Sequence, residues 1–235
     1  MFNAVFAVQT ILDVIYLFGG LKLPDGMSYA QYAHRGSYPL VVTALLAAGF
    51  VLIAYRPGPA TRETTSLRRV VLLWLAQNVF LTFTAAWRLH LYANVYSLTR
   101  LRVAAAIWML LVALGLAWIG LRITGGRSNR WLVNRTLTTT LIVLYLCCFV
   151  NFENKIAWHN ARHCREAGGE GYYLDWSYMQ QLGPEAIPAL KWLQARGIAQ
   201  TKNDALSKLE SQVSLQLQNW RGWTYRGWML LAEAF

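Results

Sequence analysis

Two histidines and a cysteine lie close together in the short sequence "WHNARHC". On a helix, His159 and His163 have the four-residue spacing at which two imidazoles can bind one metal ion. Helical zinc proteases carry a glutamate directly after the first histidine, and Asn160 occupies that position here. Cys164 would point about 100° around the helix from His163. We therefore predict a polar helix that contacts residues 92–102, with no bound metal or cofactor; a metal or haem site is the alternative.

Two charged residues lie inside apolar stretches of the sequence, Asp13 in the first and Arg88 in the third. A charged side chain at membrane depth is costly unless it is paired, so each should have a partner. Arg35, Arg88 or Arg100 could pair with Asp13. We interpret such a pair as a structural contact that fixes helix register, and a proton or ion relay is the alternative.

Two aromatic and basic segments could contact lipids or other proteins. Residues 88–102 read as a short segment between spans, either a membrane-surface helix or a re-entrant turn, facing a headgroup, a quinone or a neighbouring subunit. Residues 221–235 alternate arginine with aromatic residues, which suits either an interfacial anchor or a helix packed under a small domain. The candidate contact residues are Tyr92, Tyr96, Arg100, Arg102, Trp220, Trp223 and Trp228.

The composition places these residues in a membrane protein. Hydrophobic residues make up 56% of the 235 residues and charged residues only 14%, against about a quarter in an average soluble domain. Residues 1–150 hold 13 Lys and Arg against 3 acidic residues, and this excess falls in the short loops between apolar stretches. Nucleic-acid binding would instead require basic residues clustered on a soluble face, so we exclude it.

Five apolar stretches approach or reach the length that crosses a bilayer as a helix, at residues 2–18, 39–55, 70–89, 103–121 and 131–150. The first has the minimum length, and a buried or interfacial helix is its alternative. We predict an all-α polytopic membrane protein with about five transmembrane helices in residues 1–150. Residues 151–235 should form a small, partly interfacial helical domain.

Helical periodicity supports this C-terminal domain. Pro184 suits a first helical turn and Gly197 suits a C-terminal cap, which predicts a helix over residues 184–197. A second helix follows, because apolar residues recur there at spacings of three and four along one face. That stripe consists of Leu206, Leu209, Val213, Leu217 and Trp220.

Five crossings would place the two termini on opposite sides of the membrane. The loops at 56–69 and 122–130 would share the N-terminal side, and residues 88–102 would share the side of the C-terminal domain. The distribution of Lys and Arg favours a cytoplasmic N-terminus and a periplasmic C-terminal domain by the positive-inside rule.

Three blocks carry a family resemblance: "LPDGMSYAQYAHRGSYPLVV", "WRLHLYANVYSLTRLRVAAAIWM" and "YLDWSYMQQLGPEAIPAL". They resemble the signature blocks of the domain-of-unknown-function family 4173 and its close relative 4153, which are bacterial polytopic inner-membrane proteins. The resemblance implies an integral membrane protein with a small C-terminal helical domain, and it implies no reaction. Family members are usually longer, so the chain resembles their C-terminal half.

Three function classes follow. The first is a non-catalytic accessory, assembly or signalling subunit that acts through protein and lipid contacts, and we favour it because no catalytic motif is visible. The second is a metal- or cofactor-dependent membrane enzyme that uses His159 and His163. The third is a transporter or channel component that uses Asp13 and Arg88.

Overall fold

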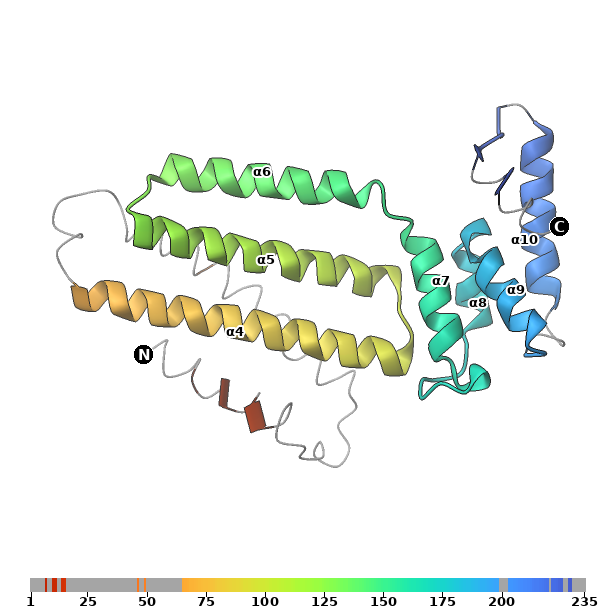
Figure 1. Ribbon diagram of the computed structural model, residues 1–235, viewed down its shortest axis with the longest axis horizontal. Helices are drawn as coiled ribbons and strands as arrows, with labels where there is room; N and C mark the ends of the chain where they lie inside the picture. The colour runs from red at the N-terminus through yellow and green to blue at the C-terminus, as the bar shows by residue number, and fades with distance from the viewer. Residues whose placement is uncertain are drawn as a thin grey trace. The chain divides into compact units, whose positions relative to one another are not determined.

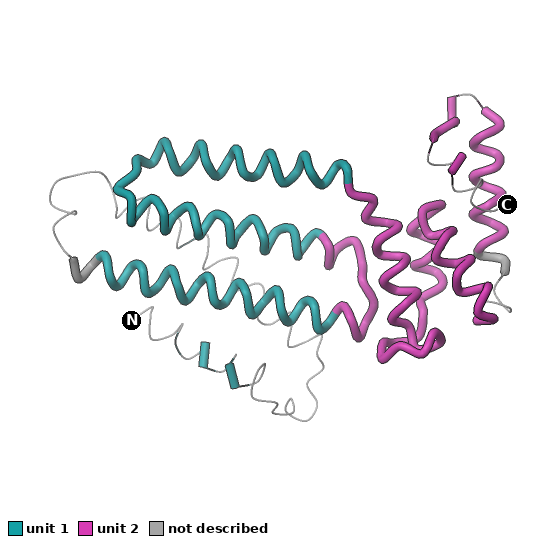
Figure 2. The backbone as a smooth tube through the Cα atoms, viewed as in Figure 1, with its two compact units in different colours: residues 1–92, 104–149 teal, residues 93–103, 150–235 magenta. Residues whose placement is uncertain are grey.

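The computed structural model describes residues 65–198, 203–219, 221–225 and 228–229, together with the single positions 7, 10, 11, 14, 15, 46 and 49. Every regular element within these residues is helical, which confirms the predicted all-α class. The chain divides into two compact units (Figure 2). Unit 1 holds residues 1–92 and 104–149, and unit 2 holds residues 93–103 and 150–235. The predicted spans 2–18 and 39–55 lie outside the described residues apart from those single positions.

Unit 1 contains most of three long helices, α4 (Thr65–Tyr96), α5 (Arg100–Gly125) and α6 (Asn129–Cys147). They lie side by side with α5 between α4 and α6 (Figure 1). The side chain of Ser128 caps α6 by accepting a hydrogen bond from the backbone N–H of Trp131, 3.2 Å away. Such a cap satisfies one of the N–H groups that a helix start leaves without a partner.

Two described helices are long and apolar enough to cross a bilayer, over Arg68–Tyr96 and Arg100–Gly125. The α6 helix meets the same standard only when joined with the next helix across a short break, so the described part of the chain has two or three candidate spans. The 26 residues of α5 extend about 39 Å at 1.5 Å per residue, which exceeds a hydrocarbon core of about 30 Å. The apolar helices therefore suit a membrane.

The helices α4 and α5 run further than their apolar stretches. We expected a separate segment at 88–102, but only residues 97–99 lie outside the two helices. The expectation of a surface helix or re-entrant turn was wrong because no glycine or proline interrupts residues 65–96. Hydrogen bonding along the backbone continues past the apolar window when nothing breaks it.

The core of unit 1 lies near the start of α4 and the end of α5. Gly120 permits a close approach there, because a Cβ at this position would lie 3.0 Å from Cδ2 of Leu75. The second half of α6 buries little: Leu141 is 66% exposed. The buried core residues are Val71, Leu75, Leu116, Ile119, Ile123 and Leu132.

Unit 2 packs short helices around a fully buried core. Its helices are α7 (Phe152–His163), η1 (Arg165–Ala167), α8 (Trp176–Gln181), η2 (Pro184–Ala186), α9 (Ile187–Ala195) and α10 (Asn203–Gln218). Asn151 and Asp175 cap α7 and α8 through their side chains. Core residues with no exposed surface include Ile156, Ala157, Ala161, Met179, Ile187 and Leu193. The described part of unit 2 therefore turns its apolar side chains inward.

The elements at residues 184–197 match the sequence expectation closely. Pro184 opens η2, which leads directly into α9, and Gly197 follows α9 with a φ of 74°. A positive φ after the last turn is the left-handed conformation that glycine adopts without strain. On α10, Leu209 and Val213 are buried in the core as the stripe predicted, and Trp220 lies outside the described residues.

Candidate functional site

The described part of unit 2 is organised around the turn between α4 and α5. The turn consists of residues 97–99, and Ser97 has the left-handed backbone with a φ of 73°. A non-glycine residue seldom adopts this conformation, so surrounding contacts must hold it. Leu98 and Val103 pack against the core formed by residues 150–219. The turn is therefore built into the C-terminal unit although it belongs to the α4–α5 hairpin.

Asn160 on α7 binds both backbone groups of Leu98. The Leu98 N–H donates to Asn160 Oδ1 at 2.6 Å, and Asn160 Nδ2 donates to the Leu98 carbonyl at 2.9 Å. Asn160 is only 3% exposed, so both hydrogen bonds form away from bulk water. Removing a partner from a buried polar group leaves its desolvation cost uncompensated. The predicted contact between this helix and residues 92–102 is therefore present, and Asn160 makes it.

Arg100 and Arg102 hold the turn from its α5 side. The Arg100 backbone N–H donates to the Tyr178 hydroxyl at 2.8 Å, and its guanidinium donates to the Gln181 carbonyl at 3.2 Å. Arg100 Nε also lies 3.3 Å from Glu153 Oε1. The Arg102 guanidinium donates to the carbonyls of Tyr96, at 2.8 Å, and of Ser97. A guanidinium next to the last carbonyls of α4 also opposes the negative end of that helix dipole.

The loop after α7 closes on the end of α4. The Tyr172 N–H donates to the Val95 carbonyl at 2.8 Å, and its ring stacks on Tyr96 with 5.9 Å between centroids. A Cβ on Gly171 would lie 2.4 Å from the His163 carbonyl oxygen and 3.1 Å from that of Asn94. Only glycine therefore fits between these two backbones. The glycine-rich sequence at residues 168–171 therefore forms a close backbone contact.

The three candidate ligands of the alternative metal site do not converge on one point. The rings of His159 and His163 stack with 4.2 Å between centroids, and His163 Nδ1 lies 2.9 Å from the His159 carbonyl oxygen. Cys164 is 2% exposed and lies in the core on the other face. Within the described residues, no three His, Cys, Asp or Glu side chains form a group that could hold a metal ion.

Burial also affects the chemistry of Cys164. Desolvation raises the pKa of its thiol, and the neighbouring Glu166 carboxylate acts in the same direction. A thiol with a raised pKa is mostly protonated near neutral pH and is a poor nucleophile. Cys164 is therefore suited to packing.

Polar residues also line one side of α4. Arg88 is 6% exposed and Asn78 is 1% exposed. The Asn78 amide donates to the Trp74 carbonyl at 2.8 Å, and the Thr82 hydroxyl donates to the Asn78 carbonyl at 2.8 Å. These bonds give the Asn78 amide N–H and the Thr82 hydroxyl acceptors on their own helix, as an apolar surrounding favours. Asp13 and Arg35, the other members of the expected ion pair, lie outside the described residues.

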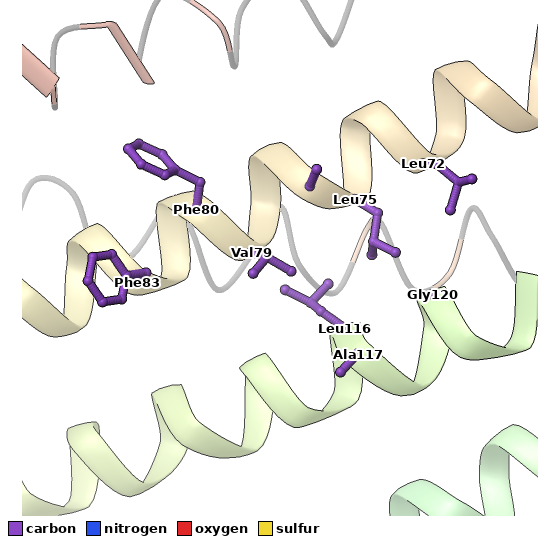
Figure 3. Close-up of a pocket in the computed structure, with 9 residues that line it drawn as sticks. Leu72, Leu75, Val79, Phe80, Phe83, Leu116, Ala117 and Gly120 are labelled. Atoms are coloured by element: carbon purple, nitrogen blue, oxygen red, sulfur yellow. The ribbon is translucent and has the colours of Figure 1, made fainter. Parts of the chain in front are cut away.

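An apolar groove of about 530 Å³ lies between α4 and α5 (Figure 3). Its lining consists of aliphatic and aromatic side chains with Gly120 at one end, and it offers no polar group that could select a ligand. The lining residues are Leu72, Leu75, Ala76, Val79, Phe80, Phe83, Leu116, Ala117 and Gly120.

The aromatic residues of the tail point outward where they are described. Trp223 and Trp228 are each 51% exposed, and Tyr225 stacks on Trp228 with 6.1 Å between centroids. They are absent from the buried core of unit 2. The exposure suits an interfacial anchor better than a helix packed under the domain.

Comparison with known proteins identifies a family. A family described as a domain of unknown function, DUF4153, matches residues 1–193. The chain belongs to this family. DUF4153 is one of the two related families that the signature blocks resemble; the match does not show the other, family 4173. No curated protein and no solved structure matches this DUF4153 chain.

Sequence reasoning missed three residues that build the site of this DUF4153 chain: Asn160, Gly171 and Tyr178. A signal for Asn160 was present, because it lies between Ala157 and Ala161 on the apolar face of α7. An amide within an apolar stripe needs hydrogen-bond partners, and a turn with unpaired backbone groups offers both a donor and an acceptor. The contacts of Gly171 and Tyr178 had no comparable signal.

Proposed function

We propose that this protein is a multi-pass inner-membrane protein that acts through protein and lipid contacts, as a non-catalytic accessory, assembly or signalling subunit. One observation carries the proposal: the C-terminal unit is built onto the α4–α5 turn through Asn160. This contact places the turn of the apolar hairpin and the C-terminal helices in the same compact unit. Such a unit can present a surface to a partner.

The same contact supports a topology. The turn at 97–99 and helix α7 must lie on one side of the membrane, because Asn160 binds Leu98 directly. If α5 crosses the bilayer away from the turn, α6 must cross back to bring α7 to that side. The 19 residues of α6 extend about 28 Å, close to the thickness of the hydrocarbon core. We therefore assign α6 as a span on its own, with α7 outside the bilayer.

Two surfaces are available for contacts. The second half of α6 and the residues just after it expose large apolar side chains, including Leu141, Tyr145 and Phe149. The tail exposes Trp223 and Trp228. An apolar helix suits lipid or another transmembrane helix, and tryptophan suits the membrane–water interface. We further propose that the N-terminus is cytoplasmic and the C-terminal unit periplasmic.

Purification in mild detergent tests the contact function. The full chain should migrate with other membrane proteins as an assembly, and a variant lacking residues 220–235 should leave that assembly while keeping its helical content. A full chain that is monodisperse and monomeric, with behaviour unchanged by the deletion, contradicts the proposal. Stoichiometric metal that is lost after His159→Ala and His163→Ala would instead support the enzyme alternative.

Compartment-specific reporters test the topology. A reporter inserted at Gly126, between α5 and α6, should lie on the opposite side of the membrane from a reporter at the C-terminus. A reporter at the N-terminus should share the side of Gly126 if the chain has five crossings. Reporters at Gly126 and the C-terminus in the same compartment would overturn the assignment of α6.

A further inference from the structure

The face of α7 opposite Asn160 forms a basic hollow. Its volume is about 400 Å³, and it is lined by six residues of this one helix. None of the six is acidic, and two, Lys155 and Arg162, carry full positive charges. The lining residues are Asn154, Lys155, Trp158, His159, Arg162 and His163.

The positive charge of the hollow is not neutralised by the neighbouring acidic side chains. Glu153 lies 3.3 Å from Arg100, and Glu185 accepts a hydrogen bond from the Asn151 amide at 2.6 Å. No carboxylate among the described residues forms an ion pair with Lys155 or Arg162. The nearby carboxylates therefore serve the turn and the start of α7, and the hollow keeps its net positive charge.

Stacking positions one of the two cations. The Arg162 guanidinium carbon lies 4.8 Å from the centroid of the Trp158 ring. Trp158 packs edge-on against Trp192, with 5.9 Å between centroids. A guanidinium on an aromatic face keeps its hydrogen-bond donors free at the edge, and these donors match the oxygens of a phosphate group. The hollow thus combines a stacked guanidinium with the ammonium of the exposed Lys155.

The chain connection limits the distance between the start of α7 and the end of α6. Only residues 148–151 separate the end of α6 at Cys147 from the start of α7 at Phe152. Four residues reach at most about 14 Å. The headgroup layer extends roughly 5–8 Å beyond each side of the hydrocarbon core. The first turns of α7 are therefore within reach of the headgroups next to α6.

We propose that the hollow on α7 binds the phosphate of an anionic phospholipid headgroup. Lys155 and Arg162 supply the charge, and the Trp158 ring positions the Arg162 guanidinium. This inference deepens the lipid-contact part of the proposed function and rests on α6 as a span. It requires no protein partner, so the purification experiment can fail or succeed independently of it, while the reporter experiment tests α6 as a span separately from lipid binding.

Native mass spectrometry of the full chain, titrated with phosphatidylglycerol or with phosphatidylcholine of the same acyl chains, tests the site. Phosphatidylglycerol should bind more tightly. Lys155→Gln with Arg162→Gln should weaken its binding by roughly 25-fold, from about fivefold for each cation removed. The matched control Lys208→Gln removes an exposed cation from α10 and should change binding less than twofold. Equal losses in the double variant and the control would overturn the proposal, because they would indicate charge alone.

A second variant and a soluble probe complete the test. The exchange Lys155→Arg with Arg162→Lys keeps both charges, so the variant should still bind phosphatidylglycerol more tightly than the double glutamine variant does, which separates charge loss from misfolding. Glycerol 3-phosphate should bind far more weakly than the lipid. Equal affinity for glycerol 3-phosphate would overturn the assignment to a lipid, since it would identify a site for a free phosphate ester.

Discussion

The two units of this protein bury apolar side chains in opposite ways. In unit 2, Leu193 has no exposed surface, and in unit 1, Leu141 on α6 is 66% exposed. The first arrangement is stable in water because burial removes apolar surface from solvent, and the second is stable where the surroundings are themselves apolar. The described apolar helices of unit 1 therefore suit a membrane, whereas the described part of unit 2 closes its core on itself.

The largest expected effect is on stability, and one leucine substitution in each unit tests the comparison directly. Leu193→Ala should lower the free energy of unfolding of unit 2 by about 2–5 kcal/mol, since it leaves a cavity in a closed core. Leu141→Ala should change stability by less than about 0.5 kcal/mol. Hydrogen exchange of α9 and α6 peptides in detergent measures both. Similar losses at the two positions would show that α6 is packed as closely as α9.

The next effect concerns the residue that joins the hairpin to the C-terminal unit. Asn160→Ala should destabilise unit 2 by about 2–4 kcal/mol, because it leaves the N–H and the carbonyl of Leu98 without their partner. Faster hydrogen exchange at residues 97–99 should accompany the loss. Gln212→Ala, on the exposed face of α10, is the control and should leave exchange unchanged. A normal turn in the Asn160 variant would mean that packing of Leu98 alone holds it.

A smaller effect is expected at a close backbone contact. Gly171→Ala should cost about 1–3 kcal/mol, because its Cβ would meet the carbonyl oxygens of His163 and Asn94. Gly115→Ala on α5 should be neutral, since nothing lies within 4 Å of a Cβ there. Thermal unfolding followed by tryptophan fluorescence compares the two. Tolerance at Gly171 would show that the loop after α7 can shift away from α4.

The smallest effect is expected at the surface ion pair. Arg100 and Glu153 side chains are 52% and 38% exposed. Solvent screens such a pair, so a double-mutant cycle with Arg100→Ala and Glu153→Ala should give a coupling energy of about 0.2–1 kcal/mol. The coupling should fall further at high salt. A larger coupling that is insensitive to salt would show that the turn is buried more deeply than its exposure indicates.

The sequence predicted those features that depend on neighbours along the chain. Pro184 and Gly197 bounded a helical stretch correctly, and the spacing of Leu209 and Val213 predicted their burial. Apolar length identified α4 and α5 as candidate spans. It ended the first at residue 89 and began the second at residue 103, whereas α4 continues to Tyr96 and α5 begins at Arg100. A helix continues past its apolar stretch where no glycine or proline interrupts it. The change to polar side chains near Arg88 therefore does not end α4.

The contacts that define the site could not be predicted in the same way. Asn160 and Leu98 are 62 residues apart, and their hydrogen bonds depend on how two helices return to one place. Periodicity identifies the face of a helix and carries no information on what that face meets. The sequence therefore indicated that α7 would contact residues 92–102, and only the structure shows that Asn160, Tyr172 and Tyr178 make the contact.

Unit 2 consists of two separate chain segments, residues 93–103 and 150–235, and the first is synthesised well before the second. The turn at Leu98 leaves the ribosome well before Asn160, which follows 62 residues later. At about 5–20 residues per second, this interval is roughly 3–12 s. During it, the turn has neither of the hydrogen bonds that Asn160 supplies, and its left-handed Ser97 is unsupported by α7. The hydrogen bonds between Asn160 and Leu98 can therefore form only after α5 and α6 have both been synthesised.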